Sequence, residues 1–205
     1  MTDDRDDAPV TGGGEEGTDP PVADGGDEGT DPPDGAVAEN DPNRFDRLPA
    51  TGAERRVPGR ATRKGVVAFW RDRYGVDPEV WDGYTFWEKG AGKVWAFASD
   101  LPAPSRVAAL GMTFLRTGGE HWKPTTDAVQ RFGRHATAED TVLDLDRERA
   151  ARFLAGEDQD LDWDGDWGYL VVRHDYGGRP EPVGVGLFLH GELQSQVPKG
   201  RRRDL

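Results

Sequence analysis

Residues 182–203 read PVGVGLFLHGELQSQVPKGRRR, and the fold is easiest to infer from this stretch. Its first half mixes aliphatic residues with two glycines, which predicts a strand over 183–189 that bends or packs closely at Gly184 and Gly186. Its second half ends in four cations within residues 199–203. Arginine holds phosphate with a planar fork of donors, so such an end is typical of a phosphate-backbone binder. A basic terminus without a partner is the alternative.

The elements upstream of this stretch are short and mixed. Asp146 caps a helix over 147–154, which lies between strands over 142–145 and 169–173. Further upstream, the pattern predicts helices over 62–74 and 124–132, a turn ending near Trp81, and strands over 84–88, 93–98 and 106–114. Because no repeated strand–helix–strand unit is present, we expect an α+β fold with a small, strongly bent sheet.

The charge of the 205-residue chain is concentrated at its start. The formal net charge is −13, and residues 1–43 alone contain 14 acidic residues and one arginine. This Gly-, Pro- and Asp-rich segment has too few apolar residues to offset the entropy of ordering, so we expect a disordered acidic tail. It either solubilises the chain or mimics nucleic acid. A linker follows, with Phe45 and Leu48 as its apolar candidates for docking, and order is expected to begin at Thr62.

The remaining residues carry equal numbers of acidic and basic groups, which are unevenly placed. Residues 139–166 hold 11 acids and three bases, so bases predominate elsewhere. One basic group comprises Arg116, His121 and Lys123 in a Gly-rich loop that also contains Trp122. A neutral domain with one acidic and one basic face is consistent with binding to a phosphate backbone. Only five of the 26 bases are lysine, a composition like that of halophilic microbes.

Several kinds of chemistry are excluded or unsupported. The chain has no cysteine, which excludes disulfide-linked partners, Cys-ligated metals and a thiolate nucleophile. Its acidic start and the lack of an apolar run of roughly 18–20 residues predict a soluble, cytoplasmic protein without a membrane partner. The acidic loop 158–166 approaches a calcium-loop pattern, but Val171 stands where a bidentate Glu is needed. The four histidines lack metal-ligand spacing. We therefore predict no catalytic residue, metal or cofactor.

The closing stretch resembles the end of Fmu/Nop/Sun-type proteins, where a glycine-bearing strand and a turn lead into Pro-Lys-Gly and arginines. Phe153-Leu-Ala-Gly156-Glu157 is similar to the family's Leu-Arg-Gly-Glu, and Trp122–Ala128 to its Lys-x-x-Pro-Ser-His-Ala segment. Residues 74–86 resemble the small module before PUA-like domains in archaeal relatives. The family comprises cytosine-5 methyltransferases of ribosomal and transfer RNA with a C-terminal PUA-like region, and short relatives in ribosome biogenesis. The resemblance is to a haloarchaeal-like, stand-alone version.

Two departures from the family limit what the resemblance implies. The family's Leu-Lys-Asn-His-Tyr-Pro-Lys-Gly is replaced after Leu193 by Gln-Ser-Gln-Val, so base contacts expected there are in doubt. The methyltransferase domain is missing, and so are the two cysteines with which those enzymes attack the pyrimidine and release the product. The resemblance therefore implies a binding protein and not an enzyme.

Together these observations predict a disordered acidic tail and linker over 1–60, a small pre-PUA α/β module over 61–100 and a PUA-like mixed β pseudo-barrel over 101–205. We expect it to bind structured ribosomal or transfer RNA, in ribosome biogenesis or as an accessory to RNA cytosine-5 methylation. The expected RNA-binding residues are Arg116, Trp122, Lys123, Lys199, Arg201, Arg202 and Arg203. The alternative is an adaptor that docks a separate RNA methyltransferase or ribosomal protein. A small enzyme with a pocket around His174 or His190 is a third hypothesis.

Overall fold

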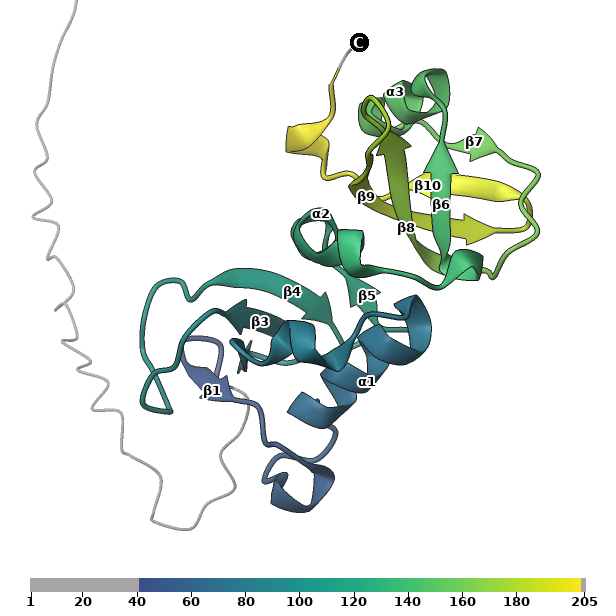
Figure 1. Cartoon of the computed structure of the whole chain (residues 1–205). Coiled ribbons are helices and arrows are strands. Elements are labelled where there is room, and N and C mark those ends of the chain that lie inside the picture. Colours follow the sequence, from purple (N-terminus) through teal and green to yellow (C-terminus); the bar gives the residue numbers. More distant parts are fainter. Residues whose placement is uncertain (1–40, 204–205) are drawn as a thin grey trace, which may run out of the picture. The chain divides into compact units, whose positions relative to one another are not determined.

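Two five-stranded sheets organise residues 41–203, the part of the chain that the computed structural model describes (Figure 1). The first is antiparallel, in the order β1-β2-β3-β4-β5, with bounds Phe45–Arg47, Thr85–Lys89, Lys93–Phe97, Met112–Arg116 and Lys123–Pro124. The second has the order β6-β8-β9-β10-β7, with strands β6 Val142–Leu145, β7 Gln159–Asp160, β8 Gly168–Asp175, β9 Pro180–Leu189 and β10 Glu192–Ser195. Its β6 is parallel to β8 and its other pairs are antiparallel, so this sheet is mixed. The predicted α+β class is confirmed.

Three α-helices connect these strands, namely α1 Arg63–Tyr74, α2 Thr126–Phe132 and α3 Arg147–Ala155. Short 3₁₀ helices occur at Gly52–Glu54, Pro78–Trp81, Gly133–His135, Glu139–Thr141 and Lys199–Arg201. Within residues 41–203, no helix combines the length and apolar character needed to cross a membrane.

Helix α1 begins and ends where its capping residues predict. The hydroxyl of Thr62 accepts a hydrogen bond of 2.9 Å from the backbone N–H of Gly65, and Gly75 ends the helix in the left-handed conformation. Val66, Trp70 and Tyr74 recur every four residues and are all fully buried. The helix therefore presents one apolar stripe to the core.

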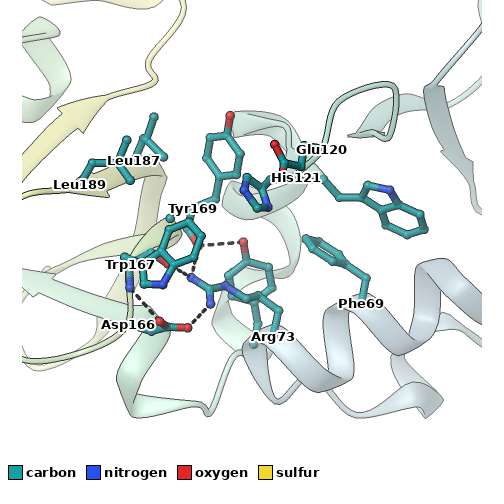
Figure 2. Close-up of a pocket in the computed structure, with 12 residues that line it drawn as sticks. Phe69, Arg73, Glu120, His121, Asp166, Trp167, Tyr169, Leu187 and Leu189 are labelled. Carbon is teal, nitrogen blue, oxygen red and sulfur yellow. Dashed lines mark hydrogen bonds and ion pairs between the residues drawn. The ribbon is translucent and has the colours of Figure 1, made fainter.

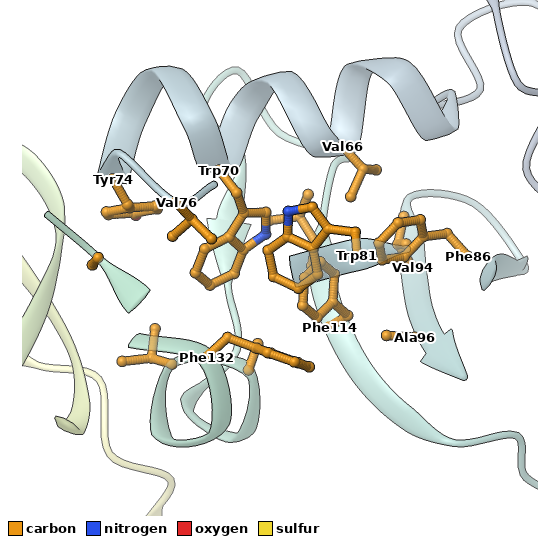
Figure 3. Packing of buried hydrophobic residues seen from close by; sticks show 14 of the residues in the cluster. Val66, Trp70, Tyr74, Val76, Trp81, Phe86, Val94, Ala96, Phe114 and Phe132 are labelled. Atoms are coloured by element: carbon orange, nitrogen blue, oxygen red, sulfur yellow. The ribbon is translucent and has the colours of Figure 1, made fainter. Parts of the chain in front are cut away.

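That stripe packs on a dense aromatic core (Figure 3). The ring of Trp70 stacks on Phe114 of β4 at a centroid distance of 5.2 Å, and Trp81 meets Phe132 of α2 edge-on at 4.8 Å. The same cluster includes the buried residues Val142, Val171 and Val185, which belong to the second sheet. One apolar cluster therefore contains residues of both sheets and packs them together.

The second sheet closes over α3 because two glycines in β9 leave room for it. A Cβ atom at Gly184 would lie 3.2 Å from the ring of Phe153, and one at Gly186 would lie 2.5 Å from Leu193 and 2.9 Å from Val172. Phe153 is fully buried in the space that results. The predicted close packing at these glycines is confirmed.

Three expectations differ from the structure. Order begins before Thr62, because β1 pairs with β2 and Phe45 and Leu48 are both buried. The strand expected over 106–114 starts only at Met112, since Gly111 has a φ of +55° and its backbone approaches the carbonyl of Ala96 too closely for a side chain. The boundary expected after residue 100 does not separate the sheets, because β4 pairs with β3. The acidic-tail prediction falls mainly on residues 1–40, outside the described residues.

Candidate nucleic-acid interface

The basic segment, residues 199–203, is anchored by backbone and side-chain hydrogen bonds and exposes its cations. Lys199, Arg201, Arg202 and Arg203 are all exposed. The backbone N–H of Arg203 donates to the carbonyl of Leu154 at 3.2 Å, and Nε of Arg202 donates to the carbonyl of Val197 at 3.3 Å. The end of α3 thus fixes the path of the basic segment while leaving most of its donors to solvent.

Gly156 ends α3 at the point where the basic segment passes the helix. It caps the helix with a φ of +87°, and a Cβ atom there would lie 2.3 Å from Nε of Arg202. A side chain at this position would be strained and would also displace Arg202. The Gly156-Glu157 pair singled out in the sequence therefore has a structural role beside the basic end.

Gln196 joins the basic group of Arg116, His121 and Lys123 to the closing segment, which comprises residues 196–203. The ammonium of Lys123 donates to Oε1 of Gln196 at 2.5 Å, and the hydroxyl of Thr126 donates to the Gln196 carbonyl at 3.4 Å. Nearby, Arg201 forms an ion pair of 2.6 Å with Asp127 in the first turn of α2. The structure therefore brings the two predicted basic groups together, although more than 70 residues separate them in the chain.

Lys123 and Arg116 differ in exposure. Lys123 is half-buried with its ammonium 5.4 Å from the ring centroid of Tyr169, whereas Arg116, its partner in the β4–β5 pairing, is exposed. Burial lowers the pKa of Lys123, and the charge of Arg116 lowers it further. Arg116 is therefore the freer of the two cations for an external ligand, and Lys123 holds the closing segment.

Trp122, one of the expected RNA-binding residues, does not have an exposed ring. It is half-buried and packs on Phe69 of α1 with the ring centroids 5.6 Å apart. The exposed tryptophan is instead Trp167, at 57% exposure. The sequence alone does not distinguish Trp122 from Trp167, because packing against α1 covers Trp122 and leaves Trp167 exposed.

Trp167 belongs to a pocket of about 490 Å³ that the sequence did not reveal (Figure 2). The pocket is framed by α1, by the loop that precedes β5, and by β8 and β9. Aromatic and aliphatic side chains form most of its wall, and the lining residues are Phe69, Arg73, Tyr74, Glu120, His121, Trp122, Asp166, Trp167, Gly168, Tyr169, Leu187 and Leu189.

One side of this pocket is fixed by Arg73 of α1. Its guanidinium forms an ion pair with Asp166 and donates to the carbonyls of Trp167 at 2.5 Å and Tyr169 at 3.4 Å. The hydroxyl of Tyr74 donates to the Tyr169 carbonyl at 3.0 Å, and burial raises the pKa of Tyr74 well above its usual value. Residues 166–169, which lead into β8, are therefore joined to α1 by these contacts.

The acidic loop and the remaining histidines have other surroundings. Asp158 accepts a hydrogen bond from the backbone of Ser195, and Asp166 is paired with Arg73. Within residues 41–203, no group of three or more His, Asp or Glu side chains is placed to hold a metal ion. His174 lies 2.9 Å from the carbonyl of Leu145, and His190 is exposed at the β9–β10 turn. Neither lines the pocket beside Trp167.

The bent mixed sheet, with α3 following β6 and a basic segment closing the fold on the end of α3, defines a PUA-like domain. Residues 140–203 match the family described as the methyltransferase RsmF PUA domain, which confirms the resemblance for the C-terminal region, including Phe153–Glu157 and the closing stretch, and supports RNA binding in general. Residues 31–111 match a family of unknown function, DUF7122. No curated protein matches the chain.

Proposed function

We propose that this protein binds structured ribosomal or transfer RNA through its basic closing segment, without catalysing a reaction on it. The observation that carries the proposal is the exposed set of cations at the end of a PUA-like domain, where a backbone hydrogen bond joins Arg203 to Leu154 of α3. Its role would be in ribosome biogenesis or as an accessory to RNA cytosine-5 methylation. The chain contains no cysteine with which to perform that methylation itself.

Phosphate contacts would come from Lys199, Arg201, Arg202 and Arg203, with Arg116 on the neighbouring edge. Arg201 is engaged with Asp127, but this pair is half exposed. Exposed pairs contribute only about 0–1 kcal/mol, so a phosphate group can replace the carboxylate at small cost. Because each phosphate contact releases counterions, affinity should fall steeply with salt concentration.

Filter binding or fluorescence anisotropy against ribosomal and transfer RNA tests the proposal. We would replace Lys199, Arg201, Arg202 and Arg203 together by alanine, and compare a control in which four other exposed cations are replaced: Arg55, Arg56, Lys64 and Arg179. Both variants lose the same charge. The first should bind weakly, with the slope of log affinity against log salt reduced by about 3–4, at roughly 0.9 per phosphate contact.

Equal affinity of the two variants would refute the assignment of the closing segment. A methyltransferase or ribosomal protein that co-purifies with the chain after nuclease treatment, while RNA binding is absent, would favour the adaptor alternative. Thermal unfolding followed by circular dichroism would show that both variants are folded.

A further inference from the structure

The pocket beside Trp167 has polar groups that the fold does not use. Glu120 and His121 both line it and are exposed (Figure 2). Among the described residues, the Glu120 carboxylate forms no hydrogen bond or ion pair, and the ring of His121 packs against Trp167 in a T-shaped arrangement, at 5.4 Å between centroids. The Glu120 carboxylate can therefore accept hydrogen bonds from a ligand.

Trp167 itself is exposed but held in place. Its backbone N–H donates to Asp166 at 2.9 Å, its carbonyl accepts from Arg73, and its ring stands perpendicular to His121 with an interplanar angle of 84°. A large aromatic ring on a hydrogen-bonded backbone that is still 57% exposed offers a flat surface to a ligand. Such rings stack on nucleic-acid bases.

Cations lie next to this surface on the side of β5. Lys123 is over the ring of Tyr169, which lines the same pocket, and Arg116 pairs with Lys123 across β4 and β5. A nucleotide with its base in the pocket would therefore have its phosphate near positive charge. Pocket volumes of about 300–1,000 Å³ are typical of small-ligand sites, so one nucleotide is of suitable size.

We propose that this pocket binds a single unpaired guanine of the RNA, stacked on Trp167 and recognised by Glu120. The Watson–Crick edge of guanine presents two adjacent N–H donors, which match the two oxygens of a carboxylate. Adenine and cytosine each present one amino group beside an acceptor nitrogen, and uracil presents one N–H between two carbonyls that a carboxylate repels. The inference rests on the proposed function, because the base belongs to bound RNA.

The test uses the full chain and four hairpin RNAs that differ only in a single bulged base, G, A, C or U, with affinity measured by fluorescence anisotropy. The wild-type protein should bind the G bulge most tightly. Trp167→Ala should weaken that binding about 5- to 150-fold, the range for one lost base–aromatic stack, and Trp167→Phe should retain most of it. Glu120→Gln should remove the preference for G while leaving the other three affinities nearly unchanged.

Matched controls are available in the same chain. Tyr176 is as exposed as Trp167, at 57%, and Glu148 is an exposed acid on α3, so Tyr176→Ala and Glu148→Gln should both bind like wild type. RNA binding by the wild type without an effect of Trp167→Ala or without a preference for G would overturn the guanine site and leave the proposed function standing. Absence of any RNA binding would overturn both.

Discussion

Arg60 lies between two carboxylates that face each other across the pairing of β1 with β2. Asp46 and Glu88 are register partners, and Arg60 contacts them at 3.3 Å through Nη2 and at 2.7 Å through Nε. The side chains of Arg60 and Glu88 are only 8% and 2% exposed. Like charges directly opposite in a sheet are destabilising, and the positive charge of Arg60 offsets the repulsion between Asp46 and Glu88.

Replacing Arg60 with methionine should therefore destabilise the protein strongly. Removal of one partner from a buried ion pair costs about 3–5 kcal/mol, because the remaining charge is left uncompensated. The lower end of that range is expected here. Asp46 retains Arg44 at 3.0 Å, and Glu88 still accepts a hydrogen bond of 2.8 Å from the backbone of Gly92.

Urea unfolding followed by tryptophan fluorescence measures this loss directly. Arg60→Met, Glu88→Gln and the double variant form a cycle, in which the double variant should lose less than the sum of the single losses by about 0.5–3 kcal/mol. Arg71→Met is the control, since Arg71 forms an exposed pair with Asp72 and its removal should change little. If Arg60→Met were no more destabilising than Arg71→Met, or if the two losses in the cycle simply added, the buried-charge argument would be refuted.

Three further changes test other parts of the structure. Tyr74→Phe should cost about 1 kcal/mol of stability at neutral pH through the lost hydrogen bond. Because burial raises the pKa of Tyr74, the wild type should lose stability as the pH rises above about 10, and the variant should lose less. Urea unfolding at several pH values measures both effects. Gly186→Ala should destabilise by about 1–3 kcal/mol in thermal unfolding, since the added methyl group overlaps Leu193. Asp127→Asn should increase RNA affinity a few-fold in filter binding, because it releases Arg201 from its competing carboxylate.

The elements that could be predicted from the sequence are those whose ends are set by local chemistry. Thr62 and Asp146 accept hydrogen bonds from N–H groups three residues later, and Gly75 and Gly156 end the same helices in the left-handed conformation. Each interaction lies within one helical turn of the residue that signals it. The sequence pattern is therefore sufficient for α1 and α3.

Strand β1 could not be predicted because its cause is not local. Phe45–Arg47 lies in a polar Arg- and Pro-rich segment and is extended only because it pairs with β2, some 40 residues later. Fully buried Phe45 then packs with Trp87 and Leu110 in a cluster on the other face of the sheet. A three-residue strand has too little periodicity to indicate this from the sequence.

The candidate site shows the same limit. The basic residues could be counted along the chain, but the bond from Lys123 to Gln196 that joins the two groups depends on the packing of β5 beside the closing segment. The pocket was missed because Trp122 is covered by Phe69 while Trp167 is left exposed, and this choice is made by α1, far from both in sequence. Composition therefore predicts a basic surface, whereas the pocket depends on side-chain packing that composition does not show.

The shared core bears on whether the PUA-like region is an independent unit in this protein. The match to that family begins at residue 140, yet Val142, Val171 and Val185 are buried in the cluster formed mainly by α1, α2 and the first sheet. A fragment of residues 140–203 would expose these three valines, at about 1.5–3 kcal/mol each, out of a total stability of about 5–15 kcal/mol for a typical domain. We therefore expect the fragment to unfold at a much lower temperature than residues 41–203, as circular dichroism can measure. Equal melting temperatures would mean that the second sheet needs only its own core around Phe153.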